Sequence, residues 1–484
     1  MLAAICTSVV VARTLGPTSM GVFGFTLWLV ALLGILANLG LPSAAAKYIS
    51  EHLGRGDPEA ASNVGRRLLL TQLLLALVVA GIAAMAAAAF GRSYKPVLLI
   101  GAVLVLPRAV QEALAGSLAG AQRYDRMALV SFCIAVAEVV SVLLAAASHS
   151  GAVGMVAAIL VGDTAGLAVG FFAVRKALLW PSSAFNKGAM NKEFHRVRKF
   201  SWTVSYILIL NAVVWQRSEV LFLKWFSSLP QIAFYSIAFA LAGKLSDIAN
   251  VCTGTLMPLS SEAYGRSGLA DLRAIYTNGL KYIQMGIVPL ALFGIVLSRP
   301  AVSLIYGERY LPLVPILQIL LATVAVTTMG GVASSLIYAT DKQGFIAKFG
   351  TAVALLNLIM DLIFIPRFGA VGAAIANCSA QMLAVVVGLV YIQSIVASTF
   401  PWRDSAMIYA AALLAVTPVL CASLTAAKFG YLLVAGVFGG LVYVAALVAT
   451  GVVGSSEASF LRKNILIRLP TRPQDLITVE KHSL

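Results

Sequence analysis

The chain has 484 residues, a formal net charge of +16 and a mean hydropathy of +0.93. Hydrophobic residues make up 60% of it and charged residues only 11%, whereas a soluble globular protein has about 25% charged residues. These figures exclude a soluble catalytic domain and indicate an integral membrane protein. The excess of positive charge fits the cytoplasmic loops of such a protein, so we expect no nucleic-acid partner.

Apolar runs recur along the chain, and each is long enough to cross a hydrocarbon core of about 30 Å as a helix. The first run is shorter, with about 12 apolar residues before Arg13, and it lacks the basic leader of a signal peptide. We therefore expect an all-α membrane protein whose first helix is truncated. The fourteen predicted spans are 1–12, 18–40, 68–90, 97–119, 127–147, 153–174, 201–223, 231–256, 282–298, 312–338, 346–365, 371–395, 406–424 and 431–452.

Lysine and arginine gather in the loops that follow the even-numbered helices, and the intervening loops hold few of them. Because positive residues collect on the cytoplasmic side, both termini are predicted to be cytoplasmic. This arrangement is typical of a multi-pass protein of the cell inner (cytoplasmic) membrane. The loop at 175–200 is the richest in charge and separates six helices from eight.

Three short matches indicate an internal repeat. They pair GVFGFTL at 21–27 with AFYSIAF at 233–239, LP at 41–42 with MP at 257–258, and SLAGA at 117–121 with SLIYA at 335–339. An offset that spans six helices preserves direction, so the two halves are predicted to have parallel topology. The expected divisions are an N-terminal lobe at 1–174, a basic cytoplasmic linker at 175–200, a C-terminal lobe at 201–395, two further helices at 406–452 and a cytoplasmic tail at 453–484.

Four segments resemble a known family: VARTLGPTSMGVFGF at 11–25, GAQRYDR at 120–126, LIYGERYLPLVPILQIL at 304–320 and IPRFGAVGAAIAN at 365–377. They are similar to the polysaccharide transporters, or Wzx-like flippases, of the multidrug, oligosaccharidyl-lipid and polysaccharide exporter superfamily. The resemblance implies a V-shaped fold that opens alternately to each face. It also implies a substrate, a polyprenyl-diphosphate-linked oligosaccharide that is moved from the inner to the outer leaflet.

Two other functions stay open at this point. A cation-coupled multidrug exporter of the same superfamily would account for a surplus of acids inside the membrane. An enzyme acting on lipid-linked glycans is disfavoured, because the predicted outer loops are short and no catalytic triad, metal-ligand set or P-loop is present. We expect no cofactor and no metal. The expected partners are the anionic lipid-linked glycan, membrane lipids and polysaccharide-assembly proteins.

Charged residues inside the spans are the candidate site residues, since each costs about 2.5 to 3.5 kcal/mol at the membrane centre. Arg108 and Glu112 are four residues apart, and Lys244 and Asp247 three apart, so each pair can share a helix face as an internal ion pair. The functional alternative is that Arg108 and Lys244, with Arg217, attract the diphosphate, for which an arginine fork is well suited.

Three acids have no basic partner at helical spacing: Glu138, Asp163 and Asp361. A lone carboxylate in hydrocarbon can load and release a proton, which favours a role in cation coupling. The alternative is a protonated acid that is hydrogen-bonded to a neighbouring helix. The remaining span charges lie in NAVVWQRSEVLFLKWF at 211–226, where we expect Lys224 to anchor at the outer interface and Glu219 to find a partner on another helix.

Overall fold

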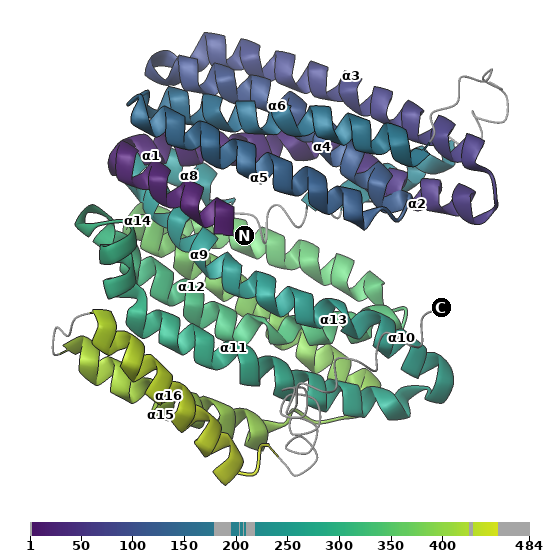
Figure 1. Cartoon of the computed structure of the whole chain (residues 1–484). Helices are drawn as coiled ribbons and strands as arrows, with labels where there is room; N and C mark the ends of the chain where they lie inside the picture. Colours follow the sequence, from purple (N-terminus) through teal and green to yellow (C-terminus); the bar gives the residue numbers. More distant parts are fainter. Residues whose placement is uncertain are drawn as a thin grey trace, which may run out of the picture.

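In the computed structural model, the described residues are 2–178, 195–202, 204–206, 208–209, 218–424 and 429–453, and within them the chain is almost entirely helical (Figure 1). Long apolar runs become helices because the bilayer offers no hydrogen-bond partners, so each span must satisfy its own backbone. No strand occurs in these described ranges.

The helices follow one another closely, and short turns separate most of them. In chain order they are α1 (Leu2–Asn38), α2 (Leu41–Gly54), α3 (Pro58–Phe90), η1 (Arg92–Tyr94), α4 (Lys95–Gly120), α5 (Tyr124–Ala147), α6 (Gly151–Leu178), α8 (Glu219–Phe226), α9 (Leu229–Gly254), α10 (Leu256–Ser267), α11 (Leu269–Ile305), η2 (Glu308–Leu313), α12 (Val314–Thr327), α13 (Met329–Ala339), α14 (Gln343–Val396), α15 (Trp402–Leu424) and α16 (Phe429–Ala449).

The predicted number of membrane spans agrees with the structure. Eleven helices of the described residues are long and apolar enough to span a membrane. Two of them, α1 and α14, each consist of two helical segments. The backbone leaves the helical region at Gly16 in α1 and at Gly369 in α14. These breaks raise the count to thirteen, and the fourteenth expected span, at 201–223, lies partly outside the described residues.

Two groups of helices make up the molecule (Figure 1). We call α1 to α6 the first lobe and α8 to α14 the second lobe, and the hairpin of α15 and α16 packs against α11 of the second lobe. The lobes meet where α1 packs against α9, α8 and η2. This arrangement is the expected fold of two lobes with two added helices.

A further sequence match supports the repeat. The tetrapeptide GAVG occurs at 151–154 and again at 369–372, an offset of 218 residues. In both copies the first glycine has a positive φ, 63° at Gly151 and 55° at Gly369, and the next helical segment begins there. A left-handed turn of this kind favours glycine, so the two copies play the same structural role.

Two short helices were not expected from the sequence. The predicted spans leave residues 41–54 and 257–267 in loops, yet they form α2 and all but the first residue of α10. The repeated LP and MP dipeptides stand at the start of these helices, where proline is tolerated because the first amides of a helix have no internal partner. In the first lobe α2 packs closely on α4, since a side chain at Gly116 would overlap the backbone of Pro42.

Candidate functional site

Polar side chains are buried together inside the second lobe. Glu219 is the first residue of α8, and Tyr235 lies on α9. The interruption of α14 at Gly369 lets both of its segments contribute, Asn357 and Asp361 from the first and Asn377 from the second. We call these five residues the carboxylate centre; all have a relative exposure of 0 or 1%.

Side-chain amides hold the two carboxylates. Asn377 Nδ2 donates to Glu219 Oε1 at 2.7 Å. Asn357 Nδ2 lies between the two acids, 3.5 Å from Glu219 Oε1 and 3.4 Å from Asp361 Oδ2. Gln381 in turn donates to Asn377 Oδ1 at 2.7 Å, which orients the Asn377 amide with its NH2 group toward Glu219.

The position of Glu219 at a helix start is favourable for an acid. The first amides of a helix carry partial positive charge, so α8 stabilises a carboxylate there. Each acid also has one buried oxygen, Glu219 Oε2 and Asp361 Oδ1, that no donor among the described residues reaches. Two carboxylates this close repel each other when both are ionised, so the centre is suited to take up a proton or a hard cation.

In the first lobe the structure corrects the expected pairing of Arg108. Its Nε atom donates to Asp163 Oδ2 at 2.9 Å, which joins α4 to α6, instead of pairing with Glu112 on its own helix. Asp163 is therefore not the unpaired acid that helical spacing predicted. Gln111 donates to the Asp163 backbone carbonyl at 2.5 Å and adds a second link between the two helices.

Arg108 is the more accessible partner of this pair. Its side chain is 33% exposed, whereas that of Asp163 is 7% exposed. The bond through Nε leaves the two terminal nitrogens of the guanidinium outside the pair. Gly162, the neighbour of Asp163 on α6, packs against the backbone of Glu138 on α5. Arg108, Asp163 and Glu138 thus come from three different helices.

For the remaining charged residues, the structure confirms one prediction, does not describe one residue and adds a contact to the third. Lys244 forms the predicted pair within α9, with Nζ 2.8 Å from Asp247 Oδ2, and both side chains are at least one third exposed. Arg217 lies outside the described residues. Lys224 does not serve only as an interfacial anchor, because its ammonium lies over the rings of Tyr94 and Phe25 of the first lobe, 4.9 and 5.5 Å from their centres.

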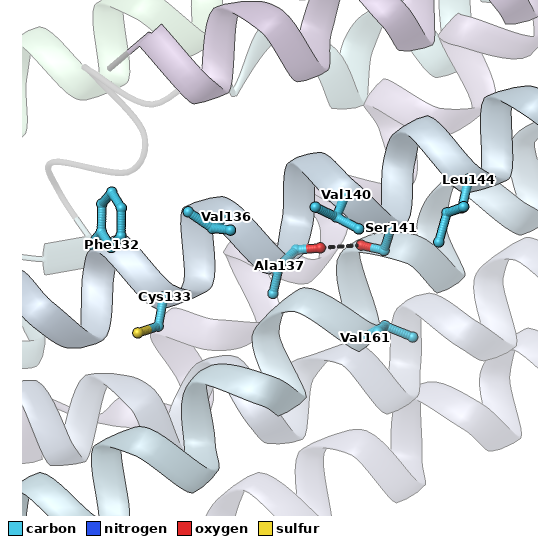
Figure 2. Close-up of a pocket in the computed structure, with 8 residues that line it drawn as sticks. All are labelled: Phe132, Cys133, Val136, Ala137, Val140, Ser141, Leu144 and Val161. Atoms are coloured by element: carbon cyan, nitrogen blue, oxygen red, sulfur yellow. Dashed lines mark hydrogen bonds between the residues drawn. The ribbon is translucent and has the colours of Figure 1, made fainter.

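An apolar groove runs along α5 beside Val161 of α6 and has a volume of about 470 Å³ (Figure 2). Ser141 is the polar residue of its lining, and the Ser141 hydroxyl already bonds the carbonyls of Ala137 and Ala158, each at 2.7 Å. The groove therefore offers hydrocarbon contact and no group for binding a charged headgroup.

The sequence identified Asp361 as a candidate site residue and predicted that Glu219 has a partner on another helix. It did not identify Asn357 and Asn377 as members of the site. A usable signal was present. Asn357 and Asp361 are four residues apart on one helix face, and Asn377 follows inside an otherwise apolar run. Neutral amides attract less attention than charges, yet in hydrocarbon they too need a partner.

Comparison of the sequence with known protein families identifies the family of this chain. Residues 1–264, more than half of the chain, match the family described as polysaccharide biosynthesis protein. The chain belongs to this family. Of the four segments that resembled polysaccharide transporters, the first two lie within the matched residues.

Relatives of this family member include a protein of Haloferax volcanii described as a probable low-salt glycan biosynthesis flippase, Agl15. The two are 22% identical over 394 residues, which cover 81% of this chain and 80% of the relative. An uncharacterised membrane protein of Methanocaldococcus jannaschii, MJ1068, is 23% identical over 232 residues, 47% of this chain and 45% of the relative.

Solved structures show the same fold. The lipid II flippase MurJ in its inward closed conformation superposes with a TM-score of 0.73 at 17% identity, over 96% of this chain and 97% of MurJ. An inward-facing multidrug resistance transporter of the MATE family superposes with a TM-score of 0.64 at 17% identity, over 82% and 94%. This family member therefore has the two-lobed fold shared by flippases and drug exporters of the superfamily.

Proposed function

We propose that the protein is a flippase that moves a polyprenyl-diphosphate-linked oligosaccharide from the inner to the outer leaflet by alternating access. The similarity to a glycan biosynthesis flippase over 81% of this chain and 80% of the relative carries the proposal. Family membership supports it independently. The proposal places the protein in the cell inner membrane with both termini cytoplasmic, next to polysaccharide-assembly proteins.

The charges of the structure divide into two proposed roles. Arg108, Lys244 and Arg217 attract the anionic diphosphate, and the exposure of the Arg108 and Lys244 side chains, 33% and 34%, leaves them accessible to a substrate. Asp163 positions Arg108. Asp361, together with Glu219, couples transport to a proton or cation, because the carboxylate centre is buried and its two acids share the amide of Asn357. Glu138 remains a second candidate for coupling.

Reconstitution tests the proposal directly. The purified full chain is placed in liposomes with a fluorescent polyprenyl-diphosphate oligosaccharide, and a membrane-impermeant quencher reports the fraction of label in the outer leaflet. We expect transfer to be faster than in protein-free liposomes and to respond to an imposed proton or sodium gradient. If the glycolipid stays in its leaflet while the same liposomes transport ethidium, the multidrug exporter replaces the flippase.

A further inference from the structure

One motif of the sequence is not used by either proposed role. The pattern G-x-x-Y-x-P occurs once in each lobe, as GRSYKP at 91–96 and GERYLP at 307–312, an offset of 216 residues. The first copy contains η1 and leads into α4, and the second contains η2 and leads into α12. Both are therefore the same turn, placed between the third and fourth helices of each half of the repeat.

The turn of the second lobe holds the first helix of the first lobe. Tyr310 is buried, and its hydroxyl donates to the backbone carbonyl of Ala12 at 2.8 Å. Ala12 lies in the last turn of α1 before Gly16 interrupts the helix, where carbonyls lose their usual partners. The Tyr310 ring packs edge-on against Phe234 at 6.2 Å, which fixes the direction of the hydroxyl.

Arg13 strengthens this side of the contact. It donates through Nε to the carbonyl of Ile305 at 2.7 Å and through Nη2 to the carbonyl of Leu304. Leu304 and Ile305 are the last two residues of α11, so their carbonyls have no partner within the helix. A cation is also favoured at a helix C-terminus, so Arg13 caps α11 across the boundary between the lobes.

The turn of the first lobe makes the reciprocal contact. Lys224, in the last turn of α8, places its ammonium 4.9 Å from the ring centre of Tyr94, within the range of a cation–π interaction. Tyr94 and Tyr310 occupy the same position in the two motifs. Lys224 follows Ala12 by 212 residues, which is the offset of the matched segments 21–27 and 233–239. Each turn thus reaches the corresponding helix of the opposite lobe.

The backbones also approach closely beside these contacts. A Cβ atom at Gly21 of α1 would overlap the backbone carbonyl of Leu229, the first residue of α9. The lobes are therefore in direct contact at this end, and the contacts formed by Arg13, Tyr310, Tyr94 and Lys224 use side chains and helix ends. They can separate without breaking hydrogen bonds inside any helix.

We propose that Arg13 with Tyr310, and Lys224 with Tyr94, form a two-fold latch that holds this end of the transporter closed. Opening toward this side requires both halves of the latch to separate. Under the predicted orientation this end faces the outside, because the basic loops lie at the other end. The duplicated turn explains why the contact has two similar halves, since each lobe contributes one tyrosine and receives the other.

Distance measurements between the two turns test the latch. Ser93 and Arg309 are exposed, are 216 residues apart and stand at the same position of the two motifs, so they suit spin labels attached to introduced cysteines. The five native cysteines are replaced by serine in the full chain, because Cys6, Cys252 and Cys421 are exposed and would be labelled too. Double electron–electron resonance then reports the separation of the turns.

We expect a mainly short distance with the intact latch and a small longer-distance population. Tyr310→Phe removes one hydroxyl and keeps the ring, and Lys224→Gln removes the cation. Each should increase the longer-distance population roughly fivefold, as expected for the loss of one modest contact, and the double variant should increase it further. Thermal unfolding and size-exclusion profiles confirm that the variants are folded.

Tyr443→Phe is the matched control. The Tyr443 hydroxyl donates to the carbonyl of Met285 at 2.9 Å, a bond of the same kind that joins α16 to α11 and does not cross between the lobes. This variant should leave the distance between Ser93 and Arg309 unchanged. Unchanged distances in the latch variants, or an equal shift in the control, would overturn the latch. A shift with Tyr310→Phe but none with Lys224→Gln would overturn its two-fold character. None of these readings depends on flippase activity.

Discussion

Asn377 donates a 2.7 Å hydrogen bond to Glu219 across 158 residues of sequence and so joins the second segment of α14 to the start of α8. The contacts that hold Glu219 come from side-chain amides and from the helix start, and the second acid of the centre, Asp361, shares one of those amides. A buried acid held in this way keeps the ability to exchange a proton or cation, which a fixed arginine or lysine partner would suppress.

Replacing Asn377 by alanine should destabilise the protein. The change leaves Glu219 Oε1 buried without its shortest hydrogen bond, at a cost of about 1 to 3 kcal/mol. Thermal unfolding in detergent measures this as a lower midpoint. Ser379→Ala is the control on the same segment, since the Ser379 hydroxyl donates to the Ile375 carbonyl of its own helix and its loss should cost less than about 0.5 kcal/mol. Equal effects of the two changes would contradict the role of Asn377.

Glu219→Gln and Asp361→Asn should remove the dependence of stability on a coupling ion. Both changes keep the side-chain shape and delete a charge. A cation that binds the folded protein raises its unfolding midpoint in proportion to the logarithm of its concentration. We expect this rise with sodium or with protons in the native chain and a flat response in both variants, measured at constant ionic strength.

Glu112→Gln provides the comparison for that experiment, because Glu112 is an exposed acid on α4. Its response should match that of the native chain. A native chain whose midpoint ignores both ions, or variants that respond as the native chain does, would remove the coupling role from the carboxylate centre.

Arg108 and Asp163 should be energetically coupled. Each single change, Arg108→Gln or Asp163→Asn, leaves one member of a partly buried ion pair without its partner, whereas the double change removes both charges. A double-mutant cycle of unfolding free energies should therefore give an interaction energy of about 1 to 3 kcal/mol. The same cycle for Arg108 and Glu112 should give a value near zero, and the opposite ranking would restore the pair that helical spacing predicted.

Low pH should weaken the contact between the helical residues 195–202 and α2. Desolvation acts to raise the pKa of Glu51, but the hydrogen bond and charge of Arg196 and the charge of Arg55 outweigh it and hold the pKa below its ordinary value. Because the folded pKa is depressed, this stabilisation is present above the ordinary value near 4.5 and is lost as the pH falls through the folded one.

Hydrogen exchange measures this effect. Protection of residues 195–202 should fall on acidification in the native chain, where Arg196 Nη1 lies 3.0 Å from Glu51 Oε1. The Glu51→Gln variant should already show low protection at neutral pH and change little on acidification. Glu262→Gln, at an exposed acid of α10, should behave as the native chain. Equal pH dependence in all three proteins would exclude Glu51 as the responsible group.

The pairs of charges show how far sequence reasoning reached. Lys244 and Asp247 pair as predicted because both stand on one helix, and the geometry of a single helix is fixed by spacing alone. The partner of Arg108 was predicted wrongly for the same reason, since Asp163 lies 55 residues away on α6. Glu219 was left without a partner because its amides are 138 and 158 residues away.

The sequence by itself determined the number and length of most spans, the parallel repeat and the family. These features follow from the hydrophobicity of successive runs and from short motifs such as IPRFGAVGAAIAN, which require no knowledge of neighbouring helices. The tertiary structure decided which polar groups meet. In hydrocarbon every buried polar group needs a partner, and helix packing alone determines which distant helix supplies it. The carboxylate centre and the latch join residues that are far apart in the sequence, so only the packed helices reveal them.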